Sequence, residues 1–391
     1  MKILFVATQY IEKGKPATGF PNYLHKVSVS LLSMGHVPMI IAGGRRNEHR
    51  VEEGIEIWTV KTVSSLDRVF SNENLAHLKM SYILNREIRK ILKKHPVDII
   101  QFTSIGGIAL FYHEKTPAVM RLSSYAKTYF ASLQTYDART LFFKAALERL
   151  SARRCDAVYA PCRNTAVAFG KDCKRQIKVI ETPFVNDVKR MDYQYVEKYL
   201  KGRKYVLFFG TLYPEKGLLV ITEILESFLE ENPEYYFVFV GEVRNINGVD
   251  ARKIIREAAG NYSKRVMIWS ALSHEKLYPI IEKSDFVVLP SLMDNLPNTC
   301  MEAMYFSKIV IGTDGASFEQ LIIPGENGLL CEIGNSQDLL EKMQKVVLLD
   351  YETKQHMEKN ARNTIRRLYP QYTVKKLLHF YDCILEKKKR C

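Results

Sequence analysis

The chain has 391 residues, 47% of them hydrophobic and 26% charged, with a formal net charge of +14. This length allows two domains of ordinary size. No apolar stretch approaches the roughly 20 residues that span a bilayer. The seven cysteines are scattered without a C-x-x-C pair, which argues against a disulfide framework and favours a reduced, cytoplasmic protein.

The positive charge is unevenly distributed along the chain. Residues 1–185 hold 28 Lys and Arg against 15 Asp and Glu, whereas the remainder holds 29 against 28. A basic half can attract anionic lipid headgroups, acidic substrates or nucleic acid, or it can simply favour solubility. The familiar nucleic-acid-binding motifs and a dense Arg-rich arm are missing, so we expect no nucleic-acid partner. An anionic membrane surface remains an expected partner.

The first half alternates apolar runs of strand length with segments of helical periodicity. The initial run at 2–8 is expected to be a strand rather than a secretory signal, because no small-residue cleavage site follows it. Residues 22–34 predict a helix that Gly35 would end. Further strands are expected at 37–42, 55–62, 97–103, 118–122, 157–160 and 177–180. Basic helices at 74–94 and 140–154 would cover a sheet or lie on a membrane surface.

A second alternating series begins at Tyr205. Its strands are expected at 206–209, 237–240, 266–269 and 286–289, and its helices at 217–230, 250–259 and 274–283. Two successive series of this kind predict an α/β protein with two doubly wound parallel sheets. The charged, Tyr-rich segment 191–203 would join the two, and 351–389 is mostly helical in pattern.

The loop after the strand at 206–209 contains Gly210 and Thr211, and Lys216 stands just before the following helix. An ammonium group at that position can meet a diphosphate. The alternative is an ordinary surface lysine in a turn.

The strand at 286–289 is followed by polar turn residues in which Asp294 and Glu302 stand eight positions apart. Backbone N–H groups at the helix start near Thr299 would bind phosphate, because they lack intrahelical acceptors. Glu302, about one turn inside the helix, could accept two hydrogen bonds from a ribose diol. The alternative is an N-capping Asp294 and an exposed Glu302 stabilised by the helix dipole.

These motifs resemble those of one enzyme family. PSLMDNLPNTCMEAM, with GTDGASFEQLIIPGENGLL downstream, resembles the E-x7-E region of the group 1 glycosyltransferases, which are retaining enzymes of GT-B architecture. FFGTLYPEKGL is similar to the family's G-R-L-x-P-E-K-G loop. Asp294 replaces the usual Glu, and Thr211 replaces the usual Arg. The resemblance is strongest over 205–335 and weaker over 1–185.

The resemblance implies a fold and a domain arrangement. We expect two Rossmann-like doubly wound domains facing a central cleft, with a C-terminal helix that crosses back to the first domain. Residues 1–190 would bind the acceptor and 204–370 the nucleotide sugar, while the helix and basic tail at 371–391 would return to the first domain.

The resemblance also implies roles in the second domain. Lys216 and the helix start at Asn298 would hold the diphosphate, and Glu302 the ribose. Asp294 and the backbone around Asn295 would contact the sugar. Glu319 matches the family's second acidic position; the alternative is that Glu319 caps a helix or interacts with its dipole. The residues expected to hold the nucleotide sugar are Gly19, Gly210, Thr211, Lys216, Asn295, Leu296, Asn298, Thr299, Glu302 and Glu319.

In the first domain the resemblance assigns Gly19 to a loop that closes over the diphosphate, the alternative being a plain surface loop. Lys13 and Lys15 could touch an anionic acceptor. Ser123 takes the position of a family His near the reacting sugar, although a hydroxyl cannot serve as a base near neutral pH. Arg121 would be an ion-pair partner or a functional group. The expected catalytic residues are therefore Asp294, Lys216 and Ser123.

The function implied is metal-independent transfer from a UDP- or GDP-linked sugar to a saccharide or lipid-linked saccharide of a bacterial surface polymer. No D-x-D or metal-binding His spacing occurs, and no cofactor is expected. The protein would be cytoplasmic and peripheral on the inner face of the membrane. Two alternatives stay open: a nucleotide-sugar epimerase of similar fold, and a nucleotide-sugar-binding protein that lost catalysis with the family's Arg and His.

Overall fold

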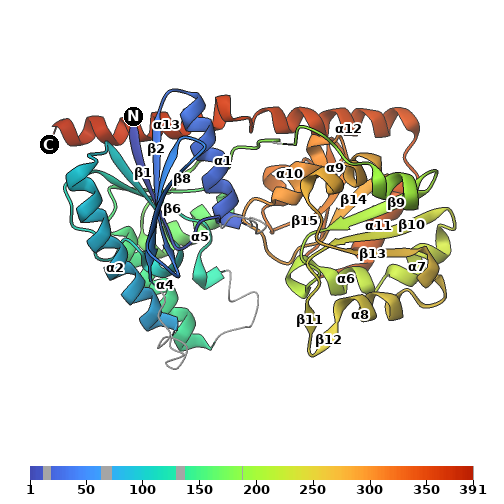
Figure 1. Cartoon of the computed structure of the whole chain (residues 1–391). Coiled ribbons are helices and arrows are strands. Elements are labelled where there is room, and N and C mark those ends of the chain that lie inside the picture. The colour runs from blue at the N-terminus through green and yellow to red at the C-terminus, as the bar shows by residue number, and fades with distance from the viewer. Residues whose placement is uncertain (12–18, 63–72, 129–136, 187, 391) are drawn as a thin grey trace. The chain divides into compact units, whose positions relative to one another are not determined.

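The computed structural model describes residues 1–11, 19–62, 73–128, 137–186 and 188–390. The chain divides into two compact units (Figure 1), the first made of Met1–Val185 with Leu368–Cys391 and the second of Asn186–Arg367. The predicted α/β architecture with two mainly parallel sheets is confirmed.

The first unit contains an eight-stranded sheet of order β3-β4-β2-β1-β5-β6-β7-β8. All neighbours are parallel except β3 and β4, and the antiparallel β3 was not predicted. The strands are β1 (Lys2–Ala7), β2 (Val37–Gly44), β3 (Glu48–Glu52), β4 (Ile55–Lys61), β5 (Ile99–Thr103), β6 (Ala118–Arg121), β7 (Ala157–Ala160) and β8 (Lys178–Val179).

Two cores cover the two faces of this sheet, because successive strand residues point to opposite sides. Leu4 and Val6 of β1 pack in one core with side chains of α2, α4 and α5, whereas Ile3 and Phe5 pack in the other with α1 and α13. The helices are α1 (Gly19–Ser33), α2 (Glu73–Lys94), α4 (Ala138–Ala152), α5 (Arg163–Cys173) and α13 (Pro370–Arg390), with a short turn η2 (Ile105–Gly107) after β5.

The C-terminal helix α13 belongs to the first unit, which confirms the predicted return. Tyr381 donates a hydrogen bond to Gln101 Oε1 at 2.5 Å, and Lys388 Nζ lies 3.1 Å from Asp156 Oδ1. With this helix included, the first unit holds 34 Lys and Arg against 17 Asp and Glu, and the second holds 23 against 26. The excess positive charge of the chain therefore lies entirely in the first unit.

The second unit contains a six-stranded, wholly parallel sheet of order β13-β10-β9-β14-β15-β16. Its strands are β9 (Lys204–Phe209), β10 (Tyr235–Gly241), β13 (Val266–Ser270), β14 (Phe286–Leu289), β15 (Val310–Thr313) and β16 (Gly328–Cys331). The short pair β11 (Asn245–Ile246) and β12 (Val249–Asp250) forms a separate hairpin. The sequence did not predict β16 or the helix α11 that follows it.

Helices cover both faces of this sheet (Figure 1). The core on one face includes side chains from α6, α7, α8 and α11. Tyr205 of β9 donates to the Ile280 carbonyl of α9 at 2.6 Å, and α10 packs on α12. The helices are α6 (Leu218–Thr222), α7 (Leu225–Glu231), α8 (Ala251–Ala258), α9 (His274–Lys283), α10 (Asn298–Tyr305), α11 (Ser336–Val347) and α12 (Tyr351–Arg366), with short turns η3 (Val196–Leu200), η4 (Pro214–Lys216), η5 (Gly260–Arg265) and η6 (Phe318–Gln320).

Two segments differ from their predictions. The helix predicted at 217–230 is broken into α6 and α7. The segment predicted to join the units, 191–203, packs on the second unit. There Tyr193 donates to Glu282 at 2.7 Å, and the ring of Tyr195 meets Trp269 edge-on at 5.1 Å. Among the described residues, no helix combines the length and apolarity needed to span a membrane.

Candidate active site

Two loops meet at the carboxyl edge of the second sheet, because the strands that precede them, β9 and β14, are parallel neighbours. The Leu292 N–H of one loop donates to the Glu215 carbonyl of the other at 2.9 Å. Gly217 has a φ of 78°, and a Cβ at that position would lie 1.9 Å from the Pro290 carbonyl oxygen. Only glycine permits this approach, which holds the Lys216 loop against the Asp294 loop.

Lys216 and Asp294 form an ion pair across these loops. Lys216 Nζ lies 2.6 Å from Asp294 Oδ2, and Asp294 Oδ1 accepts the Asn295 N–H at 3.0 Å. The Lys216 side chain is 37% exposed and that of Asp294 is 18% exposed. The fold thus brings together two predicted site residues that stand 78 positions apart.

The helix α10 begins at Asn298 after Pro297, which occupies the N-cap without a side-chain capping bond. Asp294 is therefore not the N-cap of the alternative interpretation. The nearest atom to a Cβ built on Gly210 is Thr299 Cγ2, at 3.9 Å, so the start of α10 faces the loop after β9. Its first-turn N–H groups have no acceptors within the helix and can receive phosphate oxygens.

Glu302 is 6% exposed, so it is not the exposed, dipole-stabilised side chain of that alternative either. Its Oε1 lies 3.5 Å from Nε2 of His274, the first residue of α9. The His274 ring stacks on Tyr278, with 4.9 Å between centroids and 13° between planes. Buried carboxylates are uncommon unless a partner stabilises them. The sequence reasoning missed His274, whose contact with Glu302 depends on the packing of α9 beside α10.

The other predicted residues of the second unit vary in exposure. Leu296 is 7% exposed, whereas Asn298 is exposed and Asn295, Thr211 and Thr299 are half-buried. Glu319 is exposed in η6 and follows Ser317, which has a φ of 68°. Their roles toward a ligand stay predictions.

Gly19 and Ser123 lie in the first unit. Gly19 is exposed, begins α1 and has a φ of 55°. Ser123 follows β6, its Oγ lying 3.0 Å from Thr103 Oγ1 and accepting from Arg121 Nη1 at 3.3 Å. Lys13 and Lys15, which the sequence suggested for acceptor contact, lie outside the described residues.

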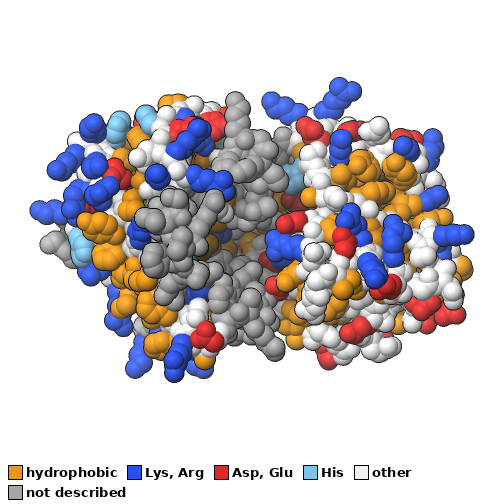
Figure 2. Space-filling model, turned by 60° about the horizontal axis from the view of Figure 1, so that its bottom comes forward, with side chains coloured by type: hydrophobic (Ala, Val, Ile, Leu, Met, Phe, Trp, Pro, Cys, Tyr) orange, Lys and Arg blue, Asp and Glu red, His pale blue; other side chains and the backbone are white. Residues whose placement is uncertain are grey.

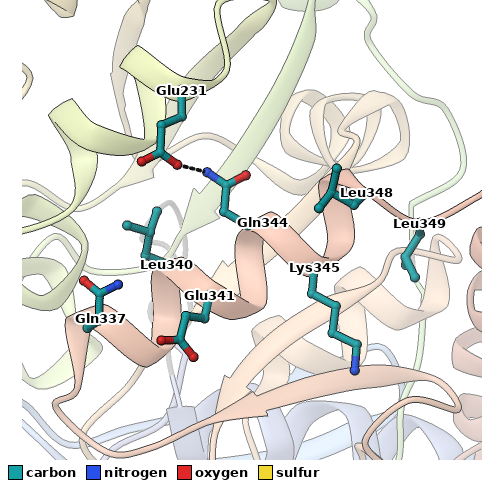
Figure 3. Close-up of a pocket in the computed structure, with 8 residues that line it drawn as sticks. All are labelled: Glu231, Gln337, Leu340, Glu341, Gln344, Lys345, Leu348 and Leu349. Atoms are coloured by element: carbon teal, nitrogen blue, oxygen red, sulfur yellow. Dashed lines mark hydrogen bonds between the residues drawn. The ribbon is translucent and has the colours of Figure 1, made fainter.

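Among the described residues, no group of three or more His, Cys, Asp or Glu side chains is arranged to hold a metal ion. A hollow of about 580 Å³ lies on the second unit between α7 and α11 (Figure 3), where Gln344 donates to Glu231 at 2.6 Å. No predicted site residue lines it: its walls are Glu231, Gln337, Leu340, Glu341, Gln344, Lys345, Leu348 and Leu349.

Residues 194–364 match the family of glycosyl transferases group 1. The matched segment covers less than half of the chain, and it includes the Lys216 loop, the Asp294 loop and Glu302. It lies within the second unit, where the sequence resemblance is strongest, so the similarity to this family is shown for that unit.

One similar curated protein is GDP-mannose:cellobiosyl-diphosphopolyprenol alpha-mannosyltransferase of Xanthomonas campestris, 25% identical over 254 residues, or 62% of this chain. The alignments with this relative and with one further curated glycosyltransferase span 64% and 37% of those proteins' lengths.

Solved structures share the fold over nearly the whole chain. Sucrose-phosphate synthase from Thermosynechococcus elongatus has a TM-score of 0.79 at 15% identity and covers 99% of this chain and 100% of its own. Anabaena Alr3699/HepE, solved with UDP and glucose, has a TM-score of 0.67 at 17% identity and covers 98% of this chain and 100% of its own. These neighbours establish the GT-B fold.

Proposed function

We propose that the protein is a retaining glycosyltransferase that moves a sugar from a nucleoside-diphosphate sugar to a saccharide or lipid-linked saccharide. One observation carries the proposal. Lys216, Asp294, the start of α10 and the buried Glu302 gather at one carboxyl edge of the second sheet. Open α/β sheets bind their ligands at such edges.

In the proposed donor site, these groups bind different parts of the nucleotide sugar. The N–H groups at the start of α10 and the Lys216 ammonium hold the diphosphate, and Glu302 accepts hydrogen bonds from the ribose hydroxyls. Asp294 contacts the sugar. Because Lys216 Nζ lies 2.6 Å from Asp294 Oδ2, an incoming diphosphate would compete with that carboxylate for the ammonium.

The proposed reaction breaks the bond between the anomeric carbon and the diphosphate oxygen. The acceptor oxygen forms its bond on the same face of the sugar, and its proton passes to the departing diphosphate. Lys216 and the α10 N–H groups stabilise the negative charge that develops on the diphosphate, which is the role that a metal ion plays in other transferases. No step requires a base at Ser123, which lacks the family's imidazole.

The proposed donor base is uracil or guanine, and the proposed pathway is bacterial surface polysaccharide synthesis. Two similar proteins support this choice of donor base. The Xanthomonas relative is a GDP-mannose enzyme, and the Anabaena neighbour was solved with UDP and glucose. That relative acts on a cellobiosyl-diphosphopolyprenol, which supports a lipid-linked acceptor here.

We also propose that the first unit docks on the cytoplasmic face of an anionic membrane. Exposed apolar side chains lie on α4, where Phe142 is 69% exposed, and Tyr82 of α2 is 58% exposed. Figure 2 shows hydrophobic side chains, in orange, among numerous blue Lys and Arg on the first unit. Aromatic side chains surrounded by cations suit the boundary between headgroups and acyl chains.

A screen of UDP- and GDP-linked sugars for thermal stabilisation tests the donor proposal, because binding to the folded state raises apparent stability. The stabilising sugar is then incubated with membrane extracts, with and without EDTA. Transfer to lipid-extractable product, insensitive to EDTA, is expected. Conversion of the sugar without any acceptor would favour the epimerase, and binding without turnover would favour the inactive binding protein. Stabilisation by none of the sugars contradicts the proposal.

A further inference from the structure

Arg121, the last residue of β6, is a buried cation in the first unit. It is 5% exposed, and it is the only arginine that counts as buried in the described part of the chain. Its guanidinium carbon lies 3.7 Å from the ring centroid of Tyr23 and 5.7 Å from that of Phe20, both in the first turns of α1. These cation–π contacts place the guanidinium beside α1 at the carboxyl end of β6.

The hydrogen-bond partners of this guanidinium are all neutral. Nη1 donates to Ser123 Oγ at 3.3 Å and Nη2 to Thr182 Oγ1 at 3.0 Å. Nε is buried and has no acceptor. Among the described residues, no carboxylate oxygen lies within 4.0 Å of Arg121.

The partly buried Lys354 has a carboxylate partner: its Nζ lies 2.6 Å from Asp285 Oδ1, with side chains 21% and 17% exposed. The partly buried Arg265 instead donates to the backbone carbonyls of Leu229, Asn232 and Tyr235. Burying a charge is costly unless an opposite charge compensates it. Arg121 is more deeply buried than either cation, and its described partners are side-chain hydroxyls and aromatic rings. An environment of this kind is a candidate ligand site.

The surroundings of Arg121 suit an anionic ligand. The loops after β5 and β6 place hydroxyl groups beside it, and Ser104 Oγ both accepts the Ser123 N–H at 3.2 Å and donates to the Ser124 carbonyl at 3.2 Å. Ser123 and Ser124 are half-buried in the described part of the chain, so part of each residue is accessible to a ligand. A planar guanidinium beside hydroxyl donors matches the oxygens of a phosphate or carboxylate.

We propose that Arg121, with the Ser123 hydroxyl, binds an anionic group of the acceptor. The acceptor would then be a saccharide that carries a phosphate or a carboxylate, rather than a neutral sugar. The anion would supply the negative charge that compensates the buried guanidinium. Identifying the anionic molecule as the acceptor rests on the proposed transferase function. Binding of an anion at Arg121 can be tested without any turnover.

The first test measures thermal unfolding with sodium phosphate, glucose 1-phosphate, glucuronate or neutral glucose, at an ionic strength matched with sodium chloride. The anionic compounds are expected to raise the unfolding temperature of the wild type, whereas glucose is not. The increase with glucuronate, which has no phosphate for the proposed donor site, is expected to be lost in Arg121→Gln and kept in Lys216→Met. The increase with the two phosphates, which the donor site can also bind, is expected to be reduced in Arg121→Gln. Equal stabilisation of wild type and Arg121→Gln would overturn the proposal.

Control variants keep this test interpretable if Arg121→Gln folds poorly. Arg121→Lys retains the charge but loses the planar fork, and it is expected to lose most of the anion effect. Arg362→Gln removes another stacked arginine, which lies 3.5 Å over Tyr305 in the second unit, and should leave the anion effect unchanged. Loss of the effect in Arg362→Gln as well would contradict a specific site.

The second test compares acceptors with the wild-type protein and its stabilising nucleotide sugar. The test uses two pairs of acceptors: one with a lipid diphosphate and its neutral analogue, and one with an acidic sugar and its neutral analogue. The pairs show whether the anion recognised is a diphosphate or a carboxylate. The charged member of one pair is expected to have a kcat/KM at least about tenfold above its neutral analogue, because charge-assisted hydrogen bonds are strong. Equal kcat/KM values within both pairs would overturn the proposal while leaving the transferase function intact.

Discussion

The two units of this protein treat their site cations differently. In the second unit Lys216 has a carboxylate 2.6 Å away, whereas the partners of the Arg121 guanidinium among the described residues are hydroxyls and aromatic rings. The second unit holds 23 basic against 26 acidic residues and the first holds 34 against 17. The half proposed to bind the nucleotide sugar is thus nearly balanced in charge, and the half proposed to meet the acceptor and the membrane is strongly cationic.

Sequence motifs are more informative in the second unit than in the first. The family match at 194–364 lies within the second unit, whose proposed ligand groups come from short loops after adjacent strands. The first unit resembles the family more weakly, and the anion site proposed there depends on burial and on contacts that the sequence does not report.

The largest effect is expected for Lys216→Met. Removing a cation aimed at the departing diphosphate should lower kcat/KM by about 100- to 1,000-fold, as for other groups that stabilise developing charge. The matched control is Lys342→Met, which removes a lysine of the same unit paired with Asp338 at 2.8 Å. Steady-state kinetics with the stabilising nucleotide sugar should show loss in the first variant only. Equal losses in both would remove the distinction between a site ion pair and a structural one.

A smaller effect is expected for membrane docking by the first unit. Replacing the exposed Phe142 with Ser should weaken binding to vesicles containing anionic lipid by about tenfold, because a buried aromatic ring contributes at least about 1.5 kcal/mol. Leu348→Ser is the control, since Leu348 is 82% exposed on the second unit. Co-sedimentation with the vesicles checks both. Unchanged binding of Phe142→Ser would show that α4 does not face the membrane.

The smallest effect concerns stability. Glu148 of α4 is 5% exposed and accepts the Ala126 N–H at 3.0 Å, and its burial raises the pKa of the carboxyl to about 8. The folded state therefore binds a proton that the unfolded state releases above its ordinary pKa near 4.5. The stabilisation is full below that value and is lost as pH rises toward 8, by up to about 1.4 kcal/mol per pH unit.

Urea unfolding at pH 5.5 and pH 7.5 checks this prediction. Glu148→Gln should lose this part of the pH dependence and gain stability relative to the wild type at the higher pH. Nucleotide-sugar binding should not change, because this buried carboxyl is structural, in contrast to Glu302 of the second unit. The same pH dependence in both proteins would contradict the assignment.

Local pattern sufficed to predict several elements of the site. The strand expected at 286–289 is β14 (Phe286–Leu289), and the helix expected near Thr299 begins at Asn298. The Lys216–Asp294 pair could not be predicted as a contact, because it depends on β9 and β14 being neighbours in the sheet. The His274–Glu302 contact depends on helix packing, and the uncompensated charge of Arg121 depends on which side chains are absent around it. Sequence spacing reports neither.

The most direct test of the central claim is the affinity of Glu302→Gln for the nucleotide sugar that stabilises the wild type, measured by isothermal titration calorimetry. The amide keeps the shape of the side chain but removes a charged acceptor, which should weaken binding by about tenfold to hundredfold. The control, Glu341→Gln, alters an acid of α11 in the hollow shown in Figure 3 and should bind normally. If Glu302→Gln binds the nucleotide sugar and turns it over like the wild type, the donor site proposed for the second unit is wrong.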